Sequence, residues 1–389
     1  MSIAAERTRR DIEFLSRAGL DLESFITESM GALGRVVPSI GSCLGTLDPA
    51  TGMITGTYKY GALAGDHAHD AEWCFLEYGE PDETSYRRLG ERGVNAVGMH
   101  LETGGRLETS PRLAKLLLPV YGVGDELRVV FRERDALWGG VCLFRSPDAP
   151  PFDASEVAFA GSLSSLIARG IRTGILVRIA HEDWGAHAGP SVLIVSADGE
   201  LRMTSPGTLQ RLADVSRGYL SDRAPTMVWT LVAAARRYAE GHMDVPPSTR
   251  VRASDGTWLV LHAAPLYAAN GPTGDVAVTI EEARAPEILP LVVAAFDLTE
   301  RESEVTALVL RGMETKEIGA ALHLSPYTVQ DHLKVIFDKA GVHNRRELIA
   351  KVYVDQYAPR VGTPLGTSGA FAEFDTSRRD RASAVQARL

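Results

Sequence analysis

The chain has 389 residues, of which 45% are hydrophobic and 23% charged, and its formal net charge is −9 at pH 7. Its length exceeds the roughly 250–300 residues at which a single hydrophobic core stops growing, so we expect two to four domains. The composition is typical of a soluble globular protein. The negative net charge excludes a protein whose whole surface is basic, but it is compatible with one local nucleic-acid site.

The cysteine content and the apolar runs indicate in which cellular compartment the protein lies. Cys43, Cys74 and Cys142 are too few and too far apart in the sequence for a disulfide framework or a zinc site, so we interpret them as small buried residues. No apolar run reaches the roughly 18 residues that a membrane span needs, and residues 1–14 lack the apolar stretch of a signal peptide. We therefore expect a cytoplasmic protein with no membrane association, no metal and no cofactor.

The first region, residues 1–180, has the pattern of an α+β sensor domain. Apolar residues recur at helical spacing over 10–34, and strand patterns follow at 40–60 and 126–145. A long helical stretch begins at residue 154 and continues to about residue 179. Helix, hairpin, irregular middle, hairpin and helix together predict an α+β domain that ends in a long helix.

A second α+β unit is predicted at residues 187–282. Two strands flank the turn at Asp198–Gly199, helical sequence follows, and three strand-like runs end the unit. Residues 283–296 form a short connector that contains prolines. The last segment, 359–389, lacks periodicity and is rich in Gly, Ser, Thr and Arg, which predicts a disordered tail.

Residues 297–354 predict an all-α bundle of four short helices. A capping residue stands at the start of three of them, where its side chain can accept a hydrogen bond from a free backbone N–H. These signals are Thr299 with Glu302, Ser325 followed by Pro326, and Asn344 with Glu347. Gly312 directly after the first helix suits a left-handed C-terminal cap.

The third of these helices has two distinct faces. Its apolar face consists of Val329, Leu333, Ile336, Phe337 and Ala340, and its polar face consists of Tyr327, Gln330, Asp331, Lys334 and Asp338. The apolar face suffices for packing, so the polar face is free to contact the edges of DNA bases. Gln can pair with adenine, Lys with the acceptors of guanine, and Asp with the amino group of cytosine.

This C-terminal segment resembles a LuxR-type helix-turn-helix domain, over LTERESEV and GMETKEIGAALHLSPYTVQDHLKVIFDKAGVHNRRELI. The resemblance implies phosphate contacts at Lys316 and Thr328 and base contacts at Gln330, Asp331 and Lys334. Tyr327 and Arg345 are further candidates for contact with double-stranded DNA. It also implies a homodimer that forms through the fourth helix, where Leu348, Ile349 and Val352 could supply an apolar patch.

The two upstream regions resemble sensor domains. Residues 44–56 and 136–172 are similar to parts of a GAF domain, although the NKFDE-type motif of cyclic-nucleotide-binding members is missing. The 187–282 unit is similar to a PAS domain, most clearly over 254–266. The GAF resemblance implies a small-molecule effector site in the irregular middle of the first region. Its candidate residues are Trp73, Phe75, Tyr78, Tyr86, Met99 and His100.

Two polar clusters have simpler interpretations. His67 and His69 have a metal-like spacing but lack a second pair of ligands, so a solvated loop is favoured. His181, Glu182 and Asp183 favour a solvated helix end over an acid–base site. No P-loop, dinucleotide fingerprint or nucleophile motif is present in the sequence.

The hypothesis from sequence is a transcriptional regulator and not an enzyme. An effector bound upstream would shift the helices near 154–180 and 286–296, and so change whether two DNA-binding domains match two half-sites. RNA polymerase is a candidate partner. The alternatives are a protein-binding sensory scaffold with a degenerate helix-turn-helix, and an enzyme with an unrecognised N-terminal active site.

Overall fold

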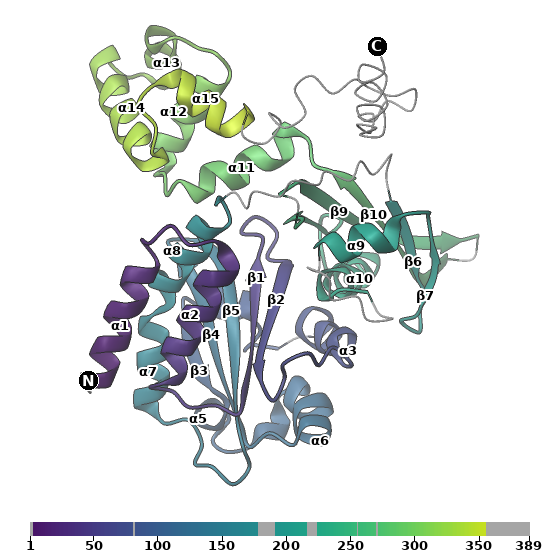
Figure 1. Ribbon diagram of the computed structural model, residues 1–389. Coiled ribbons are helices and arrows are strands. Elements are labelled where there is room, and N and C mark those ends of the chain that lie inside the picture. Colours follow the sequence, from purple (N-terminus) through teal and green to yellow (C-terminus); the bar gives the residue numbers. More distant parts are fainter. Residues whose placement is uncertain are drawn as a thin grey trace, which may run out of the picture.

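The structure is a computed structural model, and it describes residues 3–80, 82–177, 191–215, 224–254, 256–269 and 271–354. Two five-stranded antiparallel sheets are followed by a helical bundle (Figure 1). The α+β character of the N-terminal regions and the helical character of the C-terminal domain are therefore confirmed. The predicted tail at 359–389 and the cluster at His181, Glu182 and Asp183 lie outside the described residues.

The first sheet has the strand order β2-β1-β5-β4-β3. Its strands are β1 (Gly41–Leu47), β2 (Ile54–Gly61), β3 (Ala96–Gly98), β4 (Asp125–Glu133) and β5 (Ala136–Arg145). Alternate residues of a strand face opposite sides, so both faces of β4 are covered. Val129 and Phe131 belong to one apolar cluster with the flanking helices, whereas Val130 belongs to the cluster on the other face.

One face of this sheet is covered by helices from both ends of the domain. They are α1 (Ile3–Leu15), α2 (Leu22–Gly34), α7 (Ala154–Ser162) and α8 (Ser164–Gly174). The sequence pattern predicted one helix over 10–34, but α1 ends at Leu15 and a turn separates it from α2, with Gly19 at a φ of 68°. The predicted helix from residue 154 is likewise two helices, α7 and α8, with a break at Leu163.

The other face is covered by the irregular middle of the domain, which consists of short helical segments. These are α3 (Asp70–Cys74), η1 (Phe75–Gly79), α4 (Tyr86–Glu91), α5 (Met99–Thr103), η2 (Leu107–Thr109), η3 (Leu113–Leu117) and α6 (Leu118–Tyr121). Short helices gain little stability from backbone hydrogen bonds alone. Their position therefore depends on what lies between them and the sheet.

A network of buried ions lies in that space. Arg128 donates to both carboxylate oxygens of Glu77, at 2.8 and 2.9 Å, and to Glu126 at 3.1 Å. Arg112 donates to Glu126 at 3.0 Å and to Asp82 at 2.7 Å. The side chains of both arginines are completely buried. The network links η1 and η3 to strand β4, and it fixes the short segments against the sheet.

The charges of this network are compensated in place. Burial alone would raise the pKa of Asp82, but Arg112 and hydrogen bonds from Thr84 outweigh it and lower the pKa to about 2. Burial opposes ionisation of Glu126 in the same way, and the two arginines lower its pKa nevertheless. Both carboxylates are therefore ionised at neutral pH and attract the guanidinium groups.

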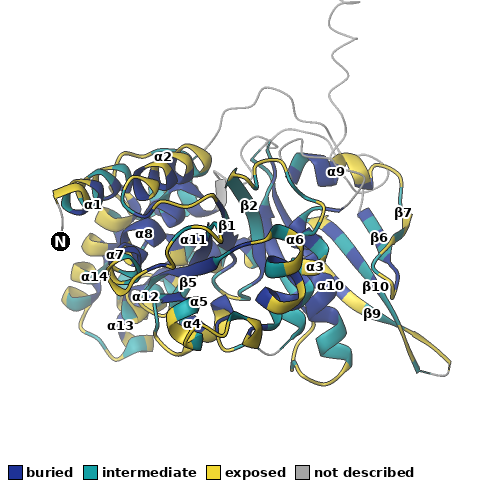
Figure 2. Cartoon of the chain, turned by 90° about the horizontal axis from the view of Figure 1, so that it is seen from below, coloured by how far each residue is buried: buried dark blue, intermediate teal, exposed yellow. Residues whose placement is uncertain are grey.

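The second sheet has the order β7-β6-β10-β9-β8. Its strands are β6 (Ser191–Val195), β7 (Leu201–Thr204), β8 (Ser248–Arg252), β9 (Trp258–Ala268) and β10 (Gly271–Glu282). Helices α9 (Thr208–Val215) and α10 (Thr226–Ala239) connect β7 to β8. Residues 226–235 of α10 are all buried, because this helix contacts the second sheet on one side and α3, η1 and β2 on the other (Figure 2).

Polar contacts also join the two sheet domains. The Thr226 hydroxyl donates to Asp70 at 2.9 Å. Arg250 of β8 donates through Nε to Asp48, at 2.8 Å, and both side chains are at most one-tenth exposed. The two domains are thus in contact through an apolar helix and through a buried ion pair.

The C-terminal bundle contains α12 (Glu300–Leu310), α13 (Thr315–Leu322), α14 (Pro326–Ala340), α15 (Arg345–Ile349) and η4 (Ala350–Val354). The connector predicted at 283–296 contains a helix, α11 (Ala285–Ala295). Ile288, Leu291 and Val292 of α11 are at most 3% exposed and belong to one apolar cluster with the bundle and with α8. No helix in the described ranges is long and apolar enough to cross a bilayer.

We predict that Arg128→Ala destabilises the protein strongly, by about 3–5 kcal/mol, because three buried carboxylates, Glu77, Asp82 and Glu126, are then left with Arg112 as their shared cation in the network. The free energy of unfolding from urea titration of the full chain measures this loss. Arg88→Ala is the matched control, because Arg88 forms only exposed ion pairs with Glu83 and Glu91. Equal stability of the two variants would contradict the role assigned to the network.

Candidate nucleic-acid interface

The turn between α13 and α14 is formed by residues with special backbone requirements. His323 ends α13 with a φ of 55°, in the left-handed region. A Cβ on Gly319 would lie 2.7 Å from the Leu324 carbonyl oxygen, so only glycine allows the chain to pass this close. Ser325 then caps α14 by accepting from the Thr328 N–H at 3.1 Å. Together these residues fix the angle at which α14 leaves α13.

Helix α14 separates its packing side chains from its exposed ones. Val329, Leu333, Ile336 and Ala340 are buried. Tyr327 is 81% exposed, and Gln330, Asp331, Lys334 and Asp338 are exposed with it. The polar face therefore lies on the surface, where a base edge could reach it, and the apolar face packs the helix into the bundle.

The candidate phosphate contacts have different surroundings. Lys316 is exposed in the first turn of α13. Thr328 is half-buried, and its hydroxyl lies 2.8 Å from that of Ser325. Arg345 is half-buried as well, and its Nη1 donates to the Met313 carbonyl in the turn between α12 and α13. Arg345 thus already has a structural contact, and its contact with phosphate stays a prediction.

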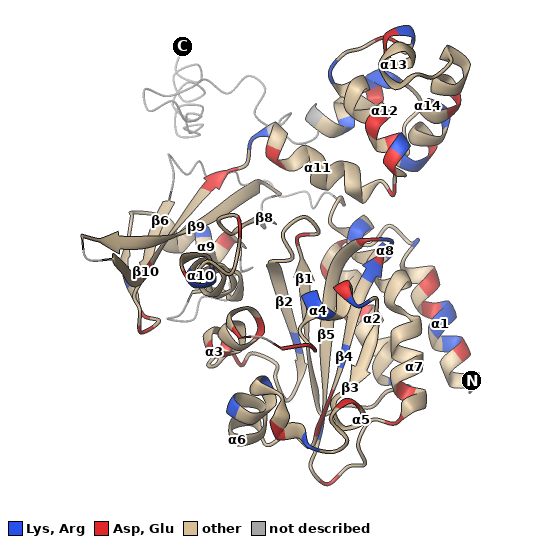
Figure 3. Cartoon of the chain, turned by 180° about the vertical axis from the view of Figure 1, so that it is seen from behind, with Lys and Arg blue, Asp and Glu red and all other residues tan. Residues whose placement is uncertain are grey.

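The bundle offers little net charge to DNA. Residues 297–354 contain eight Lys and Arg and nine Asp and Glu, and the two signs are interspersed over the helices (Figure 3). Lys339 is engaged within the bundle, because it donates to Glu302 at 2.6 Å and to the Asp297 carbonyl at 2.9 Å. A domain of this kind makes few phosphate contacts, so its affinity should depend only modestly on salt.

The first sheet domain holds the segment that leads into the bundle. Arg172 of α8 donates to the Ala295 carbonyl at 2.8 Å in a buried contact. Arg134, in the turn between β4 and β5, donates to the Leu298 carbonyl at 2.8 Å. Asp297, between these two points, accepts an ion pair from Arg134 at 3.3 Å. We name residues 295–298 the hinge segment.

Backbone strain in the hinge segment shows how tightly it is held. Asp297 has a φ of 56°, which costs a residue with a Cβ roughly 1–2 kcal/mol. Arg134 opposite it also has a positive φ, of 53°. Such conformations persist where surrounding contacts determine them, and here the contacts come from both the sheet domain and Lys339 of the bundle.

The fourth predicted helix of the bundle consists of α15 and η4, and η4 lies against α11 of its own chain. Leu348 and Val352 are at most 4% exposed and belong to the cluster that includes α11. Ile349 is half-buried. The apolar patch predicted for dimer contact is therefore mostly packed inside the chain, because α15 packs against α12 and α14 and η4 packs against α11.

The six candidate effector residues of the first domain have different surroundings. Tyr86 is buried beside the ion network, with its hydroxyl 3.0 Å from the Cys142 sulfur and the Arg128 guanidinium over its ring. Phe75 packs edge-on against Trp229 of the second domain. Trp73 and Tyr78 pack against both domains, Met99 is buried, and the His100 backbone N–H donates to Asp125. Their role in effector binding stays a prediction.

The comparisons with known proteins concern the C-terminal bundle. A family model described as bacterial regulatory proteins, luxR family, matches residues 297–352. The spore germination protein GerE of Bacillus subtilis is 36% identical over 55 residues, which cover 14% of this chain and 74% of that protein. The chain belongs to the LuxR family. Its α12–η4 bundle is a LuxR-type helix-turn-helix domain.

Two longer relatives match over the same domain. The transcriptional regulatory protein DesR of Bacillus subtilis is 41% identical over 68 residues, or 17% of this chain and 34% of that protein. UhpA of Escherichia coli is 43% identical over 56 residues, or 14% of this chain and 29% of that protein. The chain thus spans about a third of the length of these relatives.

Solved structures resemble the chain only weakly. A phage VqmA–DPO complex covers 43% of this chain and 82% of its own, with 22% identity and a TM-score of 0.24. The sensor region of a sensor histidine kinase covers 68% of this chain and 97% of its own, with 12% identity and a TM-score of 0.19. The family assignment therefore rests on the helix-turn-helix domain.

We predict that Lys334→Ala costs roughly 1–3 kcal/mol of specific DNA affinity and relaxes the sequence preference at one position, as loss of one base contact does. Competition gel shifts on selected duplexes measure both effects. Lys115→Ala is the control, because Lys115 is exposed and ion-paired with Glu80 in the first domain. An unchanged binding profile for Lys334→Ala would remove this residue from the interface.

We predict that Arg172→Ala accelerates amide hydrogen exchange across the hinge segment by about tenfold or more, because it removes a buried charged donor worth roughly 1.5–3 kcal/mol. Exchange measured by mass spectrometry on the full chain reports this directly. Arg17→Ala, which breaks only an exposed pair with Glu13, should leave the same peptides unchanged. Unaltered exchange in the Arg172 variant would show that other contacts hold the segment.

Proposed function

We propose that the chain is a sequence-specific, DNA-binding transcriptional regulator of the cytoplasm. It binds double-stranded operator DNA as a homodimer, and its GAF-like and PAS-like domains control that binding in response to a small-molecule effector or a protein. The observation that best supports this proposal is the exposed polar face of α14 on a LuxR-type bundle. Gln330, Asp331 and Lys334 contact bases on this hypothesis, and Lys316 and Thr328 contact the phosphate backbone.

The hinge segment supports control by the upstream domains. Arg172 and Arg134 of the first sheet domain both contact it directly. A movement of residues 295–298 relative to that domain therefore exchanges these hydrogen bonds. An effector acts on DNA binding if it binds the two arrangements with different affinity.

Packing of α11 on the fourth helix supports the same proposal. If the fourth helix is the dimer contact, as the family resemblance implies, α11 must shift to expose η4, which carries Val352. Dimer formation is then coupled to the release of α11 from the fourth helix. Contact with RNA polymerase would follow from DNA binding next to a promoter, and no enzymatic step is part of this proposal.

We expect the full chain to enrich a partly palindromic sequence from random duplex DNA, because two copies of α14 would contact two half-sites. Selection followed by gel shift and light scattering measures the sequence, the affinity and the stoichiometry. The Gln330→Ala, Lys334→Ala double variant is the matched control, since both side chains are exposed and the fold should persist.

Failure of the full chain to enrich any sequence would sink the regulator proposal. It would favour a protein-binding sensory scaffold with a degenerate helix-turn-helix. A single half-site bound by one protomer would instead refute the homodimer. In either case circular dichroism must show that the protein is folded.

A further inference from the structure

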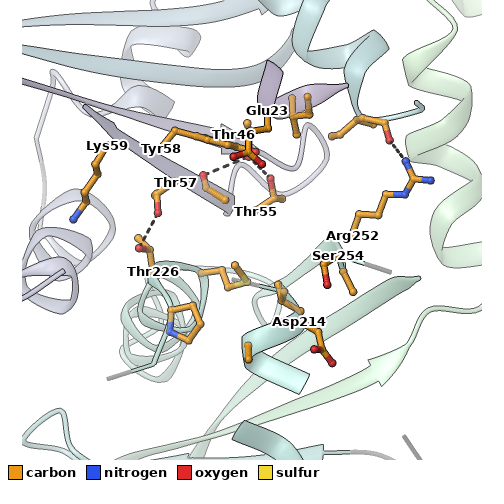
Figure 4. Close-up of a pocket in the computed structure, with 18 of the residues that line it drawn as sticks. Glu23, Thr46, Thr55, Thr57, Tyr58, Lys59, Asp214, Thr226, Arg252 and Ser254 are labelled. Atoms are coloured by element: carbon orange, nitrogen blue, oxygen red, sulfur yellow. Dashed lines mark hydrogen bonds between the residues drawn. The ribbon is translucent and has the colours of Figure 1, made fainter. Parts of the chain in front are cut away.

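A cavity of about 600 Å³ lies at the junction of the two sheet domains (Figure 4). The first domain contributes α2, β2 and the end of α8 to its walls, and the second contributes α9, the start of α10 and β8. The volume is within the range of small-molecule sites, roughly 300–1,000 Å³. None of the six aromatic and neighbouring residues proposed from sequence lines it, so this is a different site.

Hydroxyl groups are the most frequent polar groups in the cavity walls. They belong to Thr27, Thr46, Thr55, Thr57, Tyr58, Tyr60, Thr226 and Ser254. Some of them contact one another, as the Thr46 and Thr55 hydroxyls do at 2.7 Å and the Thr57 and Thr226 hydroxyls at 3.2 Å. Hydroxyls both donate and accept, so they suit a neutral molecule with several polar atoms.

Two of the cations in the walls are paired with acids of the protein, and a third, Arg252, donates to backbone carbonyls. Lys59 is ion-paired with Asp70, and Arg250 with Asp48. Two further carboxylates, Glu23 and Asp214, also line the cavity. A carboxylate or phosphate entering the cavity would lose hydration without gaining a net positive surrounding, which disfavours anionic ligands.

One buried donor in the cavity wall has no acceptor among the described residues. Trp258 lines the cavity and is 4% exposed, and its indole N–H has no hydrogen-bond partner in the part of the chain that the structure describes. A buried donor without an acceptor costs about 1–3 kcal/mol. An acceptor atom on a bound molecule would remove that cost and give binding a direction.

We propose that this junction cavity is the effector site, and that its ligand is an uncharged small molecule with a carbonyl or hydroxyl acceptor for Trp258. The assignment of an effector rests on the proposed function, whereas binding in the cavity does not. The site lies between the domains and not inside either sheet domain, so a bound molecule contacts both at once.

Helix α8 links the cavity to the hinge segment. Arg252 of β8, in its wall, donates to the carbonyls of Ile175 and Val177 at 2.7 and 2.9 Å. Ile175 and Gly174, at the end of α8, line the cavity as well. Arg172, which holds the Ala295 carbonyl, lies two residues before Gly174 on the same helix. A molecule that moves the end of α8 therefore moves a residue that holds the hinge segment.

The test uses probe molecules that differ in charge but hardly in shape. Nicotinamide and benzamide carry a neutral carbonyl acceptor, and nicotinate and benzoate are their anionic counterparts. Saturation-transfer NMR on the full chain measures their binding. We expect transfer to both amides, with the acids at least about fivefold weaker, because the cavity lacks a net positive charge.

Two variants locate the binding. Thr57→Trp should abolish transfer to the amides by filling the cavity, and Trp258→Phe, which keeps the ring but removes the N–H, should weaken it at least about threefold. Glu108→Trp adds the same bulk at an exposed position and should leave binding unchanged. Absence of amide binding, equal binding of the acids, or amide binding that persists in both cavity variants would overturn the site.

DNA binding by the same proteins separates this inference from the proposed function. If wild type binds its selected duplex, Thr57→Trp should change the apparent Kd at least about threefold relative to Glu108→Trp. Amide binding that responds to the cavity variants without any DNA binding would retain the site and refute the regulator. DNA binding that is identical in the two tryptophan variants would refute the effector role of the cavity.

Discussion

The contact on which the arrangement of this protein most depends is the hydrogen bond from Arg172 to the Ala295 carbonyl. It is buried, it joins residues 123 positions apart in the chain, and its donor is charged. Glu133 keeps the guanidinium in place at 3.0 Å. Because the acceptor is a backbone atom, substitution of Ala295 cannot remove it, and the contact constrains the path of the chain into the bundle whatever side chain follows.

The buried ion network gives the first domain a different kind of constraint. A purely apolar layer under the short helices would tolerate sliding, because apolar contacts have no direction. Charged hydrogen bonds from Arg112 and Arg128 admit only the arrangement in which Glu77, Asp82 and Glu126 all meet them. The protein's own charges thus lie between the short helices and the sheet, and an open volume lies at the domain junction.

The helix-turn-helix bundle could be predicted almost residue by residue, because its helices start at capping residues and its apolar faces follow helical spacing. The structure reproduces the caps at Thr299, Ser325 and Asn344. Packing of η4 against α11 could not be predicted, since an apolar patch does not say which surface covers it. The network and the cavity were missed for a related reason: Arg112, Glu126, Thr57 and Trp258 are far apart in sequence and meet only through strand pairing and domain contact.

Both sheets have the same strand order, with the second strand at one edge and the third at the other, although no sequence repeat is visible. In each, the link from the second to the third strand carries helices, and these two links pack on each other where α10 contacts α3 and η1. Segments at equivalent places in two domains of dissimilar sequence thus form one interface. A movement of α10 against α3 and η1 would therefore change the junction that both domains share.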